Sequence, residues 1–218
     1  MEPVFVILFI AVAVALAIYA YLANKKRQEA LRNIAARLGL DFDPAKNRAV
    51  ARQFEFIDRT RKGRNRYAFN IFRGSFQEHP VEVFEYHYKA GSGKNTHHYY
   101  LSFFIVKLPI SVPELTIGPE GFFSKIAQAI GYDDIDFESH EFSRRFCVRS
   151  RDKKFAYDIC HGRMIEYLLG NPDLTIEMER EVLAVSFSGK LDLDRFEHNL
   201  KRLIRLRTLI PDYVINRS

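Results

Sequence analysis

The feature that most constrains this chain of 218 residues is an uncharged run of twenty residues near its N-terminus. Residues 4–23 read VFVILFIAVAVALAIYAYLA, and twelve of the twenty are Val, Ile, Leu or Phe. At the helical rise of about 1.5 Å per residue, the run is about 30 Å long and matches the hydrocarbon core of a bilayer. The twelve side chains favour insertion by about 4 to 7 kcal/mol. The sequence therefore predicts a transmembrane anchor over residues 1–24.

A cleaved secretory signal is the alternative interpretation of this run. Such signals carry positive charge before a shorter apolar stretch and end in a small-x-small cleavage motif. Here the only charge before the run is Glu2, and Tyr21 occupies the position that needs a small residue. The pattern favours an anchor. Because the basic residues 25–27 follow the run directly, the positive-inside rule predicts that the N-terminus lies outside and the remainder in the cytosol.

Composition adds only broad constraints. The net charge is +6 and the pI is near 9.3, which favours anionic partners such as lipid head groups, nucleic acid or an acidic protein without specifying one. Cys147 and Cys160 are the only cysteines. Two cysteines do not suggest a disulfide framework, so a reducing compartment is the simpler expectation. For Cys147, a thiol made reactive by the neighbouring arginines is one interpretation. Ordinary packing of a partly buried free cysteine is the alternative, and it is the favoured one.

Residues 25–50 form the connection between the anchor and the domain of residues 51–218. Apolar residues recur at helical spacing at Ala30, Leu31, Ile34, Ala35 and Leu38. This spacing predicts a helix that continues from the anchor, and Gly39 is placed to end it. We expect residues 42–50, which include Pro44, to be a loop or an irregular helix.

The domain reads as strands followed by packing helices. Alternating side chains predict strands over residues 66–73, 81–89 and 96–108, with a weaker one over 53–59. Prolines and glycines predict turns on either side of a brief strand over residues 115–117, and then a helix over 119–130. Two similar units follow. The first is a hairpin over residues 134–149 with a helix over 152–169. The second is a hairpin over residues 174–188 with a helix over 193–210.

This order of elements predicts an α+β fold class. An N-terminal transmembrane helix is followed by a cytosolic antiparallel sheet with about three packing helices. Asp152 and Asp192 stand where helix N-caps are expected.

The stretch KAGSGKNTHHYY, residues 89–100, contains a Gly-Ser-Gly-Lys that resembles part of a phosphate-binding loop. Alignment on Gly93-Lys94 places Tyr88 where the first glycine of a Walker A motif belongs, and Asn95 where the hydroxyl belongs. An aromatic strand follows, whereas a phosphate-binding loop needs a helix N-terminus. The sequence therefore predicts a hairpin turn and no nucleotide site.

Three residues of the same hairpin are candidates for a metal site. If Lys89 pairs with Thr96, His87 lies opposite His98, and Glu85 is two residues along on the same face. Two imidazoles and a carboxylate on one sheet face suit zinc or another divalent metal. The alternative is that these are ordinary polar residues at a hairpin end. We predict no cofactor beyond this candidate metal.

Basic residues gather near the anchor and in the loop RTRKGRNR. Candidates for contact with anionic lipid are Lys25, Lys26, Arg27, Arg59, Arg61, Lys62 and Arg64. Each contributes about 1 kcal/mol when it lies within a Debye length of an anionic leaflet. The alternative is a set of solvated faces. Since only Tyr67 interleaves the loop as an aromatic, the pattern does not favour nucleic acid.

Residues 119–169 resemble a family of bacterial membrane-anchored proteins that contain a domain of unknown function. The stretch that carries the resemblance reads PEGFFSKIAQAIGYDDIDFESHEFSRRFCVRSRDKKFAYDICHGRMIEYLL. Its recognisable words are PEGF, DIDFE, EF and FAYD. The resemblance implies a bacterial source and an inner-membrane anchor, and it carries over no catalytic residue or cofactor.

Two functions follow from the sequence. The first is a single-pass membrane protein whose cytosolic domain binds a protein partner or the anionic membrane surface. The alternative is an enzyme of unrecognised type, metal-dependent around Glu85, His87 and His98.

Overall fold

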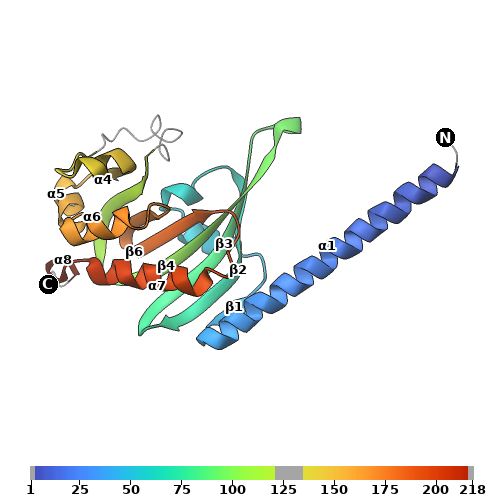
Figure 1. Cartoon of the computed structure of the whole chain (residues 1–218), viewed down its shortest axis with the longest axis horizontal. Coiled ribbons are helices and arrows are strands. Elements are labelled where there is room, and N and C mark those ends of the chain that lie inside the picture. The colour runs from blue at the N-terminus through green and yellow to red at the C-terminus, as the bar shows by residue number, and fades with distance from the viewer. Residues whose placement is uncertain (1–2, 121–134, 216–218) are drawn as a thin grey trace.

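In a computed structural model of the chain, which describes residues 3–120 and 135–215, one long helix projects from an α+β domain (Figure 1). Helix α1 (Pro3–Leu38) is continuous from the apolar run into the domain. Its N-terminal part is long and apolar enough to cross a membrane, and the side chains described there are exposed. The predicted continuity of the anchor with the following helix is confirmed, and Gly39 ends the helix at φ +67°.

A six-stranded antiparallel sheet forms the centre of the domain. Its strands are β1 (Asp41–Asp43), β2 (Arg64–Phe76), β3 (His79–Ala90), β4 (His97–Pro119), β5 (Phe146–Ser150) and β6 (Thr175–Ser188). The order is β1-β2-β3-β4-β5, and β6 pairs with the other side of β4. Strand β4 therefore organises the sheet, because β3 pairs with its first half and β5 with its last five residues.

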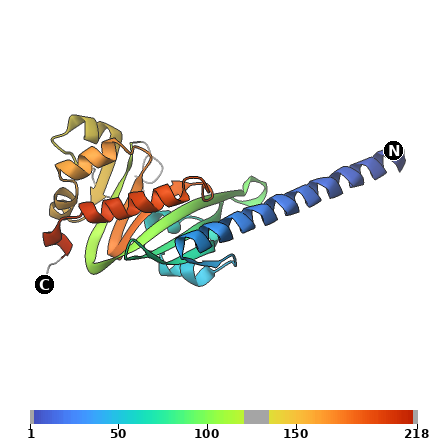
Figure 2. The ribbon, with the colours of Figure 1, turned by 60° about the horizontal axis from the view of Figure 1, so that its bottom comes forward.

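The sheet bends sharply where β4 and β6 lose regular pairing. The register between them shifts between Lys107 and Leu115, and Arg180 of β6 adopts φ +55° opposite Val112. Residues 108–114 of β4 stand opposite only residues 179–181 of β6, and extra residues of this kind bend a strand and increase its local twist. Figure 2 shows that β4 turns at this point, so the sheet curves around helix α7.

Helices cover both faces of the sheet. They are α2 (Arg48–Gln53), α4 (His140–Arg145), α5 (Lys153–Ile159), α6 (Gly162–Leu169), α7 (Phe196–Leu209) and α8 (Asp212–Ile215), with a 3-10 turn η1 (Asp58–Thr60). The inner face packs against the end of α1, α4 to α8 and the larger apolar core. The outer face packs against α2, η1 and a smaller core. The predicted fold class is confirmed.

Several predicted element boundaries are wrong. The hairpin expected over 174–188 does not form, because residues 175–188 are one strand in which the left-handed residue Arg180 stays paired with Val112, opposite extra residues of β4. The proline-rich segment after residue 108 continues β4 as far as Pro119. The predicted helix over 119–130 starts at this strand residue, and residues 121–130 lie outside the described part of the chain. The weak strand over 53–59 is instead the end of α2 and η1.

The region after residue 135 also differs from the prediction. Residues 140–145 form helix α4, with Ser139 as its N-cap, so the expected hairpin over 134–149 does not form. The expected helix over 152–169 is divided into α5 and α6, because His161 has an extended backbone and its Nε2 lies 2.9 Å from the Leu209 carbonyl. Asp152 caps α5 as predicted, whereas Asp192 accepts from the amides of a turn before α7.

Candidate functional site

Glu85, in the middle of β3, is fully buried and joins α1 to the sheet. Its Oε1 accepts from the Arg27 guanidinium at 2.5 Å and from the Leu191 amide at 2.9 Å. Its Oε2 accepts from Asn70 Nδ2 at 2.9 Å, and Asn70 Oδ1 accepts in turn from Gln28. A buried carboxylate is tolerated when it is paired and hydrogen-bonded in this way. We call Arg27, Gln28, Asn70, Glu85 and Leu191 the latch.

A bulge in β2 places Asn70 in the latch. The register between β2 and β3 shifts between Phe69 and Phe72, and Asn70 adopts φ +49°. Asparagine tolerates this left-handed conformation better than most residues. The bulge lets Asn70 reach Glu85 on the face that Phe69 also occupies, where Phe69 meets the Tyr100 ring.

Beside the latch, toward the end of the β3–β4 hairpin, lies a row of aromatic rings. The His87 ring centroid is 4.6 Å from that of Tyr67 and 5.1 Å from that of Tyr100. A lysine stands over each outer ring: Lys46 is 4.9 Å from the Tyr67 centroid and Lys190 is 5.1 Å from the Tyr100 centroid. This aromatic row therefore carries positive charge at both ends.

The two histidines of the candidate metal site meet, but in a different register from the predicted one. Lys89 pairs with His98, not with Thr96, so His87 lies opposite Tyr100. His87 and His98 are then diagonal neighbours, with His87 Nε2 3.0 Å from His98 Nδ1. Burial lowers the pKa of His87, and the neighbouring His98, Lys89 and Lys46 lower it further. This environment favours a neutral His87 imidazole.

Glu85 does not complete a metal site with these histidines. Its two oxygens bond to Arg27, Asn70 and the Leu191 amide. Within residues 3–120 and 135–215 no group of three or more His, Cys, Asp or Glu side chains is placed to hold a metal ion. The trio predicted from the sequence is thus not assembled, since the carboxylate belongs to the latch.

The Gly-Ser-Gly-Lys stretch forms the end of the β3–β4 hairpin, as predicted. A 3-10 turn η2 (Gly93–Asn95) connects the strands, and Gly91 adopts φ +88°. Arg64 of β2 donates to the Gly91 carbonyl at 2.5 Å and to Thr96 Oγ1 at 3.3 Å. We call residues 89–98 the hairpin tip. Figures 1 and 2 both show it projecting beyond the sheet on the side from which α1 leaves the domain.

The seven predicted lipid-contacting residues divide into two groups. Lys25, Lys26, Arg61 and Arg64 are exposed, and Lys62 is half-buried. Arg27 and Arg59 instead point into the protein. Arg27 belongs to the latch, and Arg59 is buried with its guanidinium bonded to the hydroxyls of Ser186 and Ser188. These two guanidinium groups therefore hold parts of the protein together and are not directed at lipid.

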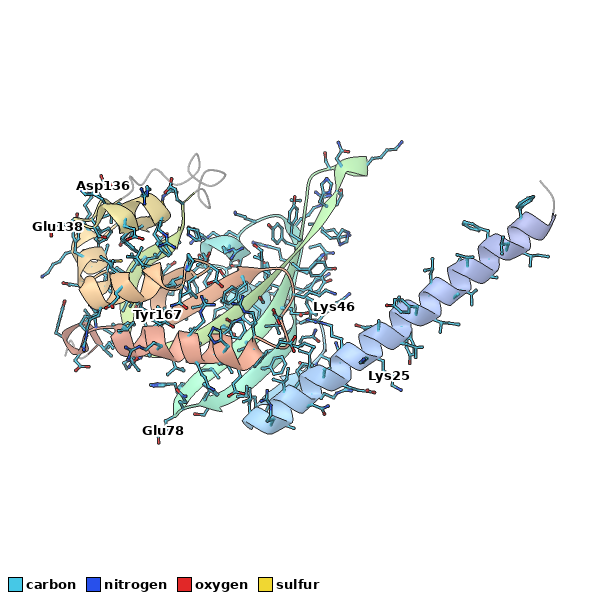
Figure 3. All side chains as sticks on the ribbon, viewed as in Figure 1. Lys25, Lys46, Glu78, Asp136, Glu138 and Tyr167 are labelled. Atoms are coloured by element: carbon cyan, nitrogen blue, oxygen red, sulfur yellow. The ribbon has the colours of Figure 1, made fainter. Side chains whose placement is uncertain are left out.

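Sequence reasoning missed other basic residues at the same end of the domain. These are Lys46, Arg48, Lys89, Lys94 and Lys190. They are scattered along the sequence as single residues, so they do not form a cluster of charge that the sequence alone would reveal. The pairing of β2 with β3 and β4 brings most of them together: Arg64 pairs with Lys89, and Lys46 and Lys190 flank the aromatic row. Figure 3 places Lys46 on the anchor-facing side of the domain.

Both cysteines are buried, and burial raises the pKa of the Cys160 thiol. A reactive Cys147 thiol stays a prediction. Its burial in β5 favours the packing alternative.

Comparison with known proteins gives a structural likeness and no sequence match. No protein-family model matches the chain, and no curated protein matches its sequence. The crystal structure of the mycobacterial trehalose monomycolate transport factor A, TtfA, matches with a TM-score of 0.60 and 12% sequence identity. The match covers 84% of this chain and 95% of that one. At this identity the likeness shows a shared fold.

Proposed function

We propose that this chain is a single-pass membrane protein whose cytosolic domain rests its basic end on an anionic membrane surface. The observation that carries the proposal is the convergence of exposed cations from separate segments at the end of the domain facing the anchor. They are Lys25 and Lys26 of α1, Lys46 and Arg48 before and in α2, Arg64 of β2, Lys94 of the hairpin tip and Lys190.

The position of the basic end relative to the apolar run can be worked out from the lengths of the helix and the strand. Arg27 of α1 and Glu85 of β3 are in contact, so both distances are counted from this pair. From Arg27 the apolar run of α1 begins about 6 Å further on, at about 1.5 Å per residue. From Glu85 the strand continues for six residues to Gly91, about 20 Å at 3.3 Å per residue. Because the hairpin and α1 leave the domain in similar directions (Figure 2), the hairpin tip extends at least as far as the start of the apolar run, which supports contact with the membrane surface.

The charge balance of this end supports contact with anionic lipid. No acidic residue occurs between Arg59 and Gln77, or between Tyr86 and Pro113. Glu85, a buried acid of β3, is paired with Arg27. Each exposed Lys or Arg near the surface adds about 1 kcal/mol of attraction. The basic residues after the apolar run also support an orientation with the N-terminus outside and, for a bacterial chain, the domain on the cytoplasmic side of the inner membrane.

A tryptophan reporter tests the proposal, because the chain contains no tryptophan. Ser92 is exposed at the hairpin tip and makes no side-chain cap bond, so Ser92→Trp is expected to be tolerated. In full-length protein held in nanodiscs, the introduced indole should shift its emission to the blue with anionic lipid and be quenched by brominated acyl chains. Neutral lipid or high salt should reduce both effects.

Two comparisons make this experiment specific. Tyr213→Trp places the same reporter at an exposed position of α8, which lies at the far end of the domain from the anchor (Figure 1), and its emission should ignore lipid charge. Lys89→Gln with Lys94→Gln should remove the response of the Ser92→Trp protein. Emission from the hairpin tip that is independent of lipid charge and salt would count against docking.

A protein partner is the second candidate, and a groove on the outer face of the sheet favours it. The groove has a volume of about 760 Å³, and Phe54, Phe56, Ile105 and Val182 contribute its apolar part. Arg180 stands over the Phe56 ring at 4.7 Å. The fold shared with a transport factor is compatible with a domain that works by binding another protein. A photo-crosslinker at Gln53, on the rim, should capture one protein with the full chain, and the capture should fall in a Phe56→Ser variant.

A further inference from the structure

A hollow beside the aromatic row has the chemistry of a phosphate site. It measures about 510 Å³ and is lined by Lys46, Arg48, Asn65 and Tyr67. These residues offer an ammonium, a guanidinium, an amide and a phenol, and no carboxylate lines the space. All four side chains can donate hydrogen bonds, which is what phosphate oxygens require.

The two cations of the hollow have little else to bind. Lys46 stands over the Tyr67 ring, and Arg48 makes one long contact, at 3.5 Å, with Asn65 Oδ1. Among the described residues neither forms an ion pair with a carboxylate. By contrast, Arg66, one residue beyond Asn65, is paired with Glu55 at 2.5 Å. A guanidinium presents several donors in a planar fork, so Arg48 retains donors that no protein acceptor uses.

The framework of the hollow is set by the fold. The backbone of Asn47 pairs with Ala68 through two hydrogen bonds of 2.7 and 3.0 Å, which fixes the loop that carries Lys46 against β2. Asn47 also caps α2 by accepting from the amides of Ala49 and Val50. Tyr67 is held by stacking on His87. The lining residues therefore come from two segments that are locked together.

We propose that this hollow binds a phosphomonoester. This inference rests on the proposed membrane docking, which brings the hollow to the lipid surface and makes the phosphate of an acidic lipid head group the nearest source. Two cations suit the double charge of a monoester better than the single charge of a diester. A soluble phosphomonoester offers the same chemistry, and the experiment separates the two sources.

The test uses the full-length chain in nanodiscs of phosphatidylcholine that contain equal amounts of phosphatidic acid, a monoester, and phosphatidylglycerol, a diester. Lipid retained by the released protein is measured by native mass spectrometry. We expect phosphatidic acid to be enriched about tenfold over phosphatidylglycerol. The additional negative charge of the monoester strengthens the hydrogen bonds from Lys46 and Arg48, and this gain corresponds to about a tenfold higher affinity. The double variant Lys46→Gln, Arg48→Gln should abolish the enrichment.

Arg52→Gln is the matched control, because Arg52 lies exposed in the same short helix but does not line the hollow. It should leave the enrichment unchanged. Glycerol 3-phosphate is then added to phosphatidylcholine nanodiscs. Saturable calorimetric binding that the double variant loses would identify a soluble phosphomonoester as the source. Enrichment of phosphatidic acid without such binding would identify the lipid.

The inference is overturned if neither phosphatidic acid enrichment nor glycerol 3-phosphate binding is observed, or if Arg52→Gln reduces either as much as the double variant does. The Ser92→Trp reporter keeps this result separate from membrane docking. If its emission still responds to phosphatidylglycerol while the hollow shows no preference, the domain docks through charge alone and the phosphate site is excluded.

Discussion

The guanidinium of Arg27 lies 2.5 Å from the carboxylate of Glu85, and this ion pair joins the anchor helix to the middle of the sheet. The two residues are 58 positions apart in sequence. Arg27 also donates to the carbonyl of Leu191, so the same guanidinium reaches the segment that leads into α7. One side chain close to the apolar run of α1 thus contacts both layers of the domain.

Removal of Arg27 should destabilise the protein strongly. In Arg27→Met the buried Glu85 side chain loses its cation and a hydrogen-bond donor, which typically costs about 3 to 5 kcal/mol. Denaturant unfolding of the full-length chain in detergent, followed by circular dichroism, measures the change. Lys26→Met is the control, because Lys26 is exposed and should change the free energy of unfolding by less than about 0.5 kcal/mol. Adding Glu85→Gln to Arg27→Met should restore part of the loss. Equal stabilities of the Arg27→Met and Lys26→Met proteins would contradict the role of the latch.

Two glycines of the hairpin tip should respond differently to alanine. Both adopt positive φ, so Gly91→Ala and Gly93→Ala each cost about 1 kcal/mol from the backbone alone. A Cβ on Gly91 would lie 2.1 Å from the Asn95 carbonyl oxygen, whereas one on Gly93 would meet nothing within 4 Å. We therefore expect faster hydrogen exchange of the β4 amides after Thr96 in the Gly91→Ala protein only. Similar exchange in both variants would mean that the turn can relax around the clash.

Glu177 should make stability fall as pH rises. Its side chain is buried, and its Oε1 has no hydrogen-bond partner among residues 3–120 and 135–215. Burial raises its pKa from 4.5 to about 7, against the opposing effect of Arg59. The folded state therefore holds a proton that the unfolded state releases above pH 4.5. The stabilisation is complete below pH 4.5 and is lost by pH 7, a total of about 3 kcal/mol.

The variant Glu177→Gln isolates this effect from other titrating groups. Its free energy of unfolding relative to the wild type should be constant below pH 4.5 and increase by about 3 kcal/mol between pH 4.5 and pH 7.5. Denaturant unfolding across that range measures the difference. Parallel curves for the two proteins would show that Glu177 is ionised in the folded state.

The local pattern of the sequence predicted the regular helices and strands of this fold. It failed where pairing between strands that are distant in sequence decides the structure. The apolar N-terminal helix, its continuation over residues 24–38, strands β2 and β3 and the first half of β4 follow from hydrophobic periodicity, whereas the short strand β1 was not predicted. By contrast, Arg180 and the proline-rich part of β4 look like turns in sequence. They remain in strands because each faces the other across a bulge, and that pairing is visible only in the folded sheet.

For the candidate site, too, the sequence predicted one part and not another. The clustering of basic residues near the anchor was predictable, but the direction of each side chain was not. Lys26 and Arg27 are neighbours, yet successive helical residues point about 100° apart, so one faces solvent and the other enters the latch. The two-residue error in the β3–β4 register had a smaller effect, because a shift of two keeps each side chain on its face.

Helix α1 runs without interruption from Pro3 to Leu38, and the latch and the core residues Leu31, Ile34 and Ala35 hold its last part against the sheet. The domain is consequently attached to one continuous helix and not to a flexible linker. A change in the tilt of α1 would therefore rotate the whole domain with it. If the domain docks as proposed, bilayer thickness sets how firmly the hairpin tip presses on the lipid surface, and the molecule responds to the membrane around it without any internal rearrangement.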